Sequence, residues 1–164
     1  MRGWGFTLFL VHVQYHRGRS PATESWVFGL VDTSQRPALG YMEIVPRRDA
    51  ATLLPIIQQH VLPGTTIWSD DWAAYNRVAA IPGVAGHGVV NHSLHFVDPV
   101  TGVNTQTVES YWNRVKTKFK RMLGVSKAQL ALHLDEFMWR ERHGKTAGQA
   151  FNNVCADIST QYPV

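Results

Sequence analysis

The sequence has little cysteine, little charge and no long hydrophobic run. A single cysteine, Cys155, stands among 164 residues, so no disulfide can form within the chain. An intracellular protein fits this composition best, in the nucleus of a eukaryote or the cytoplasm of a bacterium. The apolar run Phe6–Val13 is too short to cross a bilayer, and no small-residue cleavage site follows it. We therefore expect a buried strand there and no membrane partner.

The composition that is present is typical of a globular protein. Apolar residues make up 45% of the chain and charged residues 17%, which argues against disorder. The length suits one domain with a hydrophobic core, so we expect a single domain over residues 1–164. The net charge of +4 favours an acidic partner such as nucleic acid.

Strand-like segments rich in β-branched and aromatic residues come first. The expected strands are Gly5–Val13, Glu24–Val31, Ala38–Val45, Thr65–Ser69 and a candidate at Val89–Val90. Turn residues at 32–37 predict an antiparallel hairpin between the second and third strands. A helix capped by Asp49 is expected to run to about Val61, and a short one over Asp71–Ala79.

The C-terminal part is expected to be helical. An apolar stripe predicts a helix from about Thr105 to Met122. Capping boxes are expected at Ser126 with Gln129 and at Thr146 with Gln149. The buried face of the helix after Ser126 is expected to comprise Leu130, Leu134, Phe137 and Met138, and the apolar residues of the last helix are Ala147, Phe151, Val154, Cys155 and Ile158. This order of elements predicts a mixed α/β fold with a central sheet and C-terminal helices.

Carboxylates near strand ends are the first candidates for chemistry. Phosphodiester transfer can use two divalent ions held by converging carboxylates, and magnesium and manganese prefer oxygen ligands. Asp70 follows an apolar strand at its carboxyl end, where ligands bind in open α/β sheets. The alternative is that Asp70 or Asp71 caps the following helix, and one residue could be a ligand while the other caps.

The helix over Thr105–Met122 carries the other candidates. Glu109 and Lys116 are seven residues apart, two turns along one face, and could hold a metal ion and a phosphate together. The basic residues Arg114, Lys118 and Arg121 could follow a DNA backbone, with Lys116 beside them. Both sets could instead be the ordinary charges of a solvated helix face.

A zinc site is not expected. His92 and His95 have loose spacing and no cysteine nearby, so hydrogen-bonding roles fit them better.

An ordered series of motifs spans roughly residues 15–142, followed by a helical tail over 143–164. The series comprises Trp26–Val31, Thr52–Leu54, His60–Gly64, Ile67–Tyr75, Asn91–Pro99, Val108–Lys116 and Asp135–Arg140. In this order it resembles the ISXO-type insertion-sequence transposase domain of the DDE superfamily. One such motif would be weak, whereas the ordered series is specific.

The resemblance implies an RNase-H-like fold, with three antiparallel strands followed by strand–helix alternation, and metal-dependent DNA cleavage and strand transfer. It implies Mg²⁺ or Mn²⁺ as cofactor, transposon ends and target DNA as partners, and a homo-oligomer as a further possibility. By the resemblance, Asp70 takes the place of the second catalytic carboxylate and Glu109 that of the acid on the last catalytic helix. Lys116 matches the lysine that follows it.

Two departures put the activity in doubt. The family's first catalytic Asp stands in the first strand, but residues 5–14 hold no Asp or Glu. Asn104 stands where the family tends to carry a histidine, and its N-terminal zinc-binding and helix-turn-helix regions have no counterpart. An open reading frame that begins inside an element, or an exon replacement, would explain the N-terminus. Two hypotheses follow: an enzyme with impaired DNA cleavage and joining, or a non-catalytic DNA-binding or interaction domain left from a transposon. A restoring Asp is expected to fit near Val11–Val13.

Overall fold

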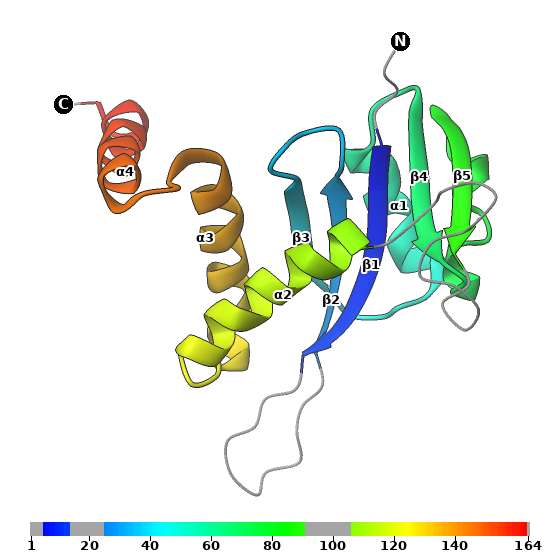
Figure 1. Cartoon of the computed structure of the whole chain (residues 1–164), viewed down its shortest axis with the longest axis horizontal. Coiled ribbons are helices and arrows are strands. Elements are labelled where there is room, and N and C mark those ends of the chain that lie inside the picture. Colours follow the sequence, from blue (N-terminus) through cyan, green and yellow to red (C-terminus); the bar gives the residue numbers. More distant parts are fainter. Residues whose placement is uncertain (1–4, 14–24, 91–105, 164) are drawn as a thin grey trace, which may run out of the picture.

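A five-stranded mixed sheet forms the centre of the chain (Figure 1). The computed structural model describes residues 5–13, 25–90 and 106–163, and for 5–13 it describes the backbone alone. The strands are β1 (Gly5–Val13), β2 (Ser25–Asp32), β3 (Leu39–Val45), β4 (Thr65–Asp70) and β5 (Val84–Val90). Their order across the sheet is β3-β2-β1-β4-β5.

The strand directions bring several segments to one edge of the sheet. β1, β4 and β5 are mutually parallel, whereas β2 is antiparallel to both β1 and β3. The ends of β1, β3, β4 and β5 and the beginning of β2 therefore lie on the same side, which we call the carboxyl edge. The candidate active site and a neighbouring pocket lie at this edge.

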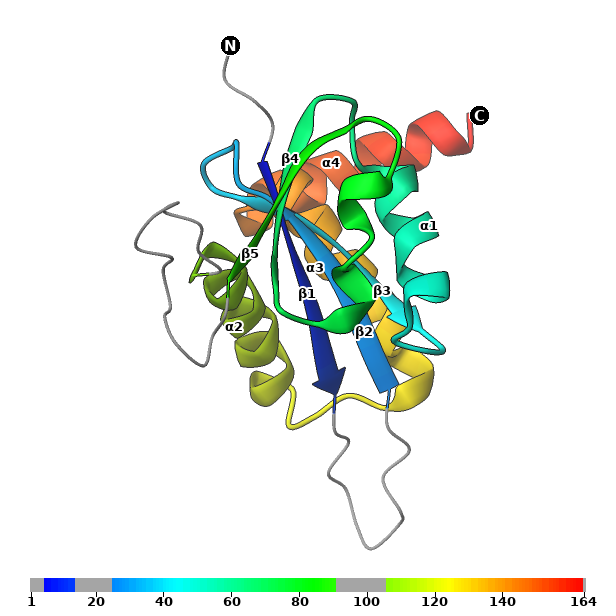
Figure 2. The ribbon, with the colours of Figure 1, turned by 90° about the vertical axis from the view of Figure 1, so that its right-hand side faces the viewer.

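Helix α1 (Ala50–His60) covers one face of the sheet, and Figure 2 shows α2 on the opposite face. The carboxylate of Asp49 accepts a hydrogen bond from the Thr52 backbone N–H at 2.9 Å, so the predicted cap is confirmed. Leu53 and Ile57 are fully buried in a core with Phe28 and Ile67 of the sheet.

Helix α2 (Gln106–Arg121) confirms the predicted stripe on the second face. Its buried residues are Val108, Tyr111, Trp112, Val115 and Phe119. They form a second core with Val27 and Val31 of β2 and Met42 of β3. Gly40 permits this packing: a Cβ atom there would lie 2.3 Å from Cζ of Tyr111. Because Gly40 has no side chain, the Tyr111 ring can pack directly on β3.

Two further helices follow α2. Helix α3 (Leu130–His143) packs on β3, where the Met42 N–H donates to Sδ of Met138 at 3.0 Å. Helix α4 (Ala147–Gln161) is capped by Thr146, whose hydroxyl accepts a hydrogen bond from the Gln149 N–H at 3.3 Å as predicted. None of the helices in the described ranges is both long and apolar enough to cross a membrane.

One short element was predicted wrongly, and another only in part. The short helix expected over Asp71–Ala79 is two 3₁₀ turns, η1 (Ala73–Tyr75) and η2 (Val78–Ala80), and the cap position of η1 is taken by Trp72. The candidate strand at Val89–Val90 is confirmed, and it is the end of a longer strand, β5. A third 3₁₀ turn, η3 (Lys127–Gln129), precedes α3.

At the start of this turn the expected capping box is replaced by a side-chain contact. The Ser126 hydroxyl donates to Oε1 of Gln129 at 3.1 Å and does not accept from the backbone. The apolar residues Phe151, Val154, Cys155 and Ile158 of α4 are exposed, because α4 lies beyond α3 and away from the sheet (Figure 1).

Candidate active site at the carboxyl edge

Asp70 is the last residue of β4 and lies at the carboxyl edge, as the sequence predicted. Thr65, Ile67 and Ser69 are buried, and Ile67 belongs to the core on the α1 side. Since side chains alternate along a strand, Asp70 belongs to the other face, which α2 covers. Burial raises the pKa of the Tyr75 hydroxyl well above its usual range, and the nearby Asp70 carboxylate raises it further.

The backbone of Asp70 is held by a pair of residues that the sequence analysis missed. The buried Ser69 hydroxyl donates to the Asp70 carbonyl oxygen at 2.8 Å and lies 2.9 Å from Nε2 of His87 on β5. The single hydroxyl proton is used by the carbonyl, so His87 donates its Nε2–H to Ser69. Burial lowers the pKa of His87, which favours the neutral ring. Since β5 itself was predicted only in part, sequence offered no signal for this pair.

Glu109 lies in the first turn of α2 and is exposed. Figure 1 shows this turn over β1, on the side where β4 ends, and α2 contacts β1 and β2. Asp70 and Glu109 are therefore assigned to the same side of the sheet. Lys116 is exposed two turns further on, with Nζ 5.9 Å from the centre of the Trp112 ring.

The predicted DNA-binding row of α2 makes contacts with α3. Arg114 forms an ion pair with Glu141 at 2.6 Å, and Lys118 forms one with Glu136 at 2.8 Å. Arg121 is exposed near the end of α2. The two ion pairs show that part of this row holds α2 against α3. Its DNA-binding role stays a prediction.

The described residues do not supply the donor set of a two-metal centre. Among the described side chains of residues 25–90 and 106–163, no group of three or more His, Cys, Asp or Glu could hold a metal ion. Two bound ions need several converging oxygen ligands, and β1 contributes no acid. His92, His95 and Asn104 lie outside the described residues.

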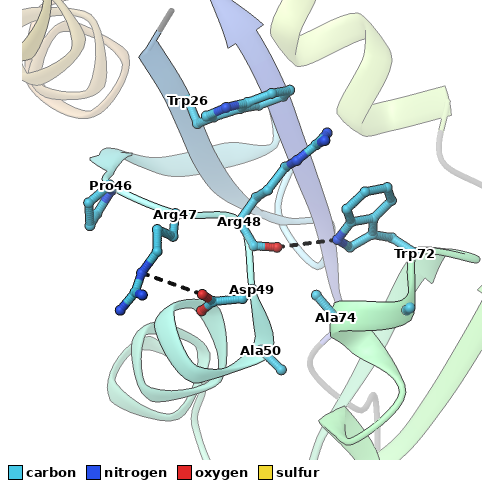
Figure 3. A pocket seen from close by; sticks show the side chains of 9 residues that line it. Trp26, Pro46, Arg47, Arg48, Asp49, Ala50, Trp72 and Ala74 are labelled. Atoms are coloured by element: carbon cyan, nitrogen blue, oxygen red, sulfur yellow. Dashed lines mark hydrogen bonds and ion pairs between the residues drawn. The ribbon is translucent and has the colours of Figure 1, made fainter.

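A second group of side chains lines an open pocket at the carboxyl edge (Figure 3). Its volume is about 660 Å³, and it lies between the start of β2, the loop after β3 and the turn after β4. The guanidinium carbon of Arg48 lies 4.5 Å from the centre of the Trp26 ring and 4.8 Å from that of Trp72. No sequence spacing links these three residues.

The match to known sequences decides the family. A family model described as "ISXO2-like transposase domain" matches residues 10–142. The chain belongs to this family. The transposase domain is also 29% identical over 109 residues to an uncharacterized transposase-like protein of Haemophilus influenzae, covering 66% of this chain and 85% of that protein.

Solved structures confirm that the transposase domain has the RNase-H-like fold. The catalytic core domain of BIV integrase superposes with a TM-score of 0.56 at 12% identity, covering 83% of this chain and 81% of the other. A chain of the simian T-cell lymphotropic virus intasome superposes with a TM-score of 0.54 at 16% identity, covering 83% and 47%. Both expectations drawn from the sequence, the family and the fold, are confirmed.

Proposed function

We propose that this chain is a transposase core that binds DNA and is impaired in metal-dependent DNA cleavage and strand transfer. Membership of the transposase family supports the DNA substrate, as does the net charge of +4. One observation carries the impairment: β1 lies directly beside β4, where an acid could meet Asp70, and it contains none.

The register of β1 against β4 indicates where an acid is missing. Gly5 pairs with Thr66 and Thr7 with Trp68. The register pairs end at Thr7 and Trp68, and extending it by two residues along both strands would place Phe9 level with Asp70. This moves the favoured position for a restoring acid from Val11–Val13 to Phe9. The two remaining carboxylates alone cannot hold the pair of ions that would stabilise the attacking and the leaving oxygen.

The test is nicking of supercoiled DNA with magnesium or manganese. We expect the natural chain to stay at background, with no further loss on Asp70→Asn. Phe9→Asp should give manganese-dependent nicking that Asp70→Asn abolishes, and His12→Asp serves as the matched variant at the alternative position. Robust nicking by the natural chain, lost on Asp70→Asn, would instead establish the active enzyme. No gain in either variant would count against the missing acid as the cause.

DNA binding by α2 is tested separately. Phosphate contacts release counterions, so affinity should fall steeply with salt, and replacing Arg114, Lys118 and Arg121 by Ala should reduce the slope of log K against log salt by about 2 to 3. Glu136→Gln is the control, since it breaks the Lys118 ion pair and keeps the cation. An unchanged slope in the triple variant would contradict the assignment of these three residues to DNA binding. Binding without any nicking in all variants would favour the second hypothesis, a non-catalytic DNA-binding domain.

A further inference from the structure

The pocket beside the candidate active site combines two flat rings with a fixed cation. Trp26 and Trp72 hold the Arg48 guanidinium between them, and Figure 3 shows its side chain reaching from the loop after β3 toward both rings. The Trp72 Nε1–H donates a long hydrogen bond of 3.4 Å to the Arg48 carbonyl oxygen. These contacts restrict the side chains of Arg48 and Trp72, so these side chains lose little further conformational entropy when a ligand binds.

The pocket is accessible and carries a small positive charge. Trp72 keeps 39% of its surface exposed. Arg47 and Arg48 line the pocket together with one acid, Asp49, which pairs with Arg47 at 3.5 Å and caps α1. The volume of about 660 Å³ falls within the range of about 300–1,000 Å³ usual for small-ligand sites.

Its position links the pocket to Asp70. Trp72 follows Asp70 by two residues, and both lie at the carboxyl edge, where β4 ends. The side chain of Asp70 belongs to the α2 side of the sheet, whereas the pocket lies on the α1 side, next to the first residue of α1. A polymer that crosses this edge would contact both Asp70 and the pocket within a few of its own repeating units.

We propose that this pocket binds an unpaired nucleotide of a DNA strand, with the base stacked on Trp72 and the phosphate held by Arg48. The inference rests on the proposed DNA-binding function. An aromatic face accepts any base by stacking, and a guanidinium fixed in orientation donates two parallel hydrogen bonds to phosphate. A duplex keeps its bases paired and stacked, so the pocket favours single strands and frayed ends.

The test separates the base from the backbone. Binding is measured for two probes of the same length. The base-bearing probe is a 12-nucleotide thymidine oligomer, and the abasic probe has the same sugar-phosphate backbone without bases. We expect the natural protein to prefer the base-bearing probe by about tenfold, because stacking on an aromatic ring strengthens binding by roughly that factor or more per base. Trp72→Leu should remove the preference, because it weakens binding of the base-bearing probe much more than binding of the abasic probe, whereas Trp72→Phe should retain most of it.

Two controls make the result specific. Arg48→Gln should weaken both probes, since both carry phosphates. Trp139→Leu changes another half-buried tryptophan, on α3, and should leave the preference intact. Thermal melting of each variant shows whether it is folded, and Trp72→Phe keeps the test valid if Trp72→Leu is not.

Equal affinity of the natural protein for both probes would overturn the inference, as would an equal loss on both with Trp72→Leu. In either case salt-sensitive duplex binding would leave the proposed function standing. Failure to bind any of these DNA probes would overturn both.

Discussion

Helices α2 and α4 are nearly equal in length, at 16 and 15 residues, and both carry a series of apolar residues. The structure buries five residues of α2 but only Ala150 of α4. Phe119 on α2 is 9% exposed, whereas Phe151 on α4 is 71% exposed.

The difference comes from what lies beneath each helix. Helix α2 lies on the sheet, where β2 and β3 supply apolar side chains and Gly40 makes room for a ring. Helix α4 contacts α3, with Ala150 beside Gly144 and a hydrogen bond of 3.0 Å from the Trp139 Nε1–H to Asp157. An apolar stripe therefore indicates that a helix face can be buried. It does not say whether the same chain covers it.

The largest expected contrast is between two identical substitutions. Phe119→Ala should lower the free energy of unfolding by about 3 kcal/mol, because it empties a packed site in the core below α2. Phe151→Ala should change it by less than about 0.5 kcal/mol, because the ring is mostly in solvent. Urea denaturation of both variants measures the difference. A similar loss in both would mean that the apolar face of α4 is covered in solution.

Two glycines sharpen the comparison at a smaller scale. Gly40→Ala should destabilise the fold by about 2 kcal/mol, since its methyl group would meet the Tyr111 ring and α2 would have to shift. Gly148→Ala in α4 meets nothing within 4 Å and should stabilise by about 0.5 kcal/mol, because alanine favours the helix. Denaturation midpoints with opposite signs are expected. A Gly40→Ala variant as stable as the natural chain would mean that α2 does not pack tightly on β3.

Features that depend on neighbouring residues were predictable from the sequence. The cap at Asp49 and the stripe of α2 depend on spacings of three and four residues, and both are confirmed. The strand ending at Asp70 was readable from its apolar run, and so was its place at the carboxyl edge.

Features that depend on the packing of distant segments were not predictable. The exposure of Phe151 depends on where α3 places the last helix. The stacking of Trp26, Arg48 and Trp72 joins three segments that meet only when β2, β3 and β4 enter one sheet. The choice of Phe9 as the position level with Asp70 needed the register of two parallel strands, extended by two residues, and a one-residue slip would change it.

The smallest expected effect concerns the ion pairs that join α2 to α3. Glu136 accepts hydrogen bonds from Lys118 at 2.8 Å and from Arg140 at 2.7 Å, and these lower its pKa from 4.5 to about 2. A carboxyl group whose pKa is lower in the folded state stabilises the fold above its unfolded pKa, and this contribution is lost as the pH falls from 4.5 toward 2. Because the side chain is 41% exposed, solvent screening should keep the loss on Glu136→Gln below about 1 kcal/mol at pH 7.

The pH dependence tests the origin of that small effect. The stability difference between the natural chain and Glu136→Gln should shrink as the pH is lowered from 7 to 3, because the carboxyl group of the unfolded chain takes up a proton in this range while that of the folded chain stays mostly ionised. Asp157→Asn is the matched change on α4, and its effect at pH 7 should be smaller, since the amide oxygen can still accept from Trp139. Chemical denaturation at pH 7, 5 and 3 gives the three differences. If the Glu136→Gln difference is the same at pH 7 and pH 3, the contact between α2 and α3 does not depend on this charge.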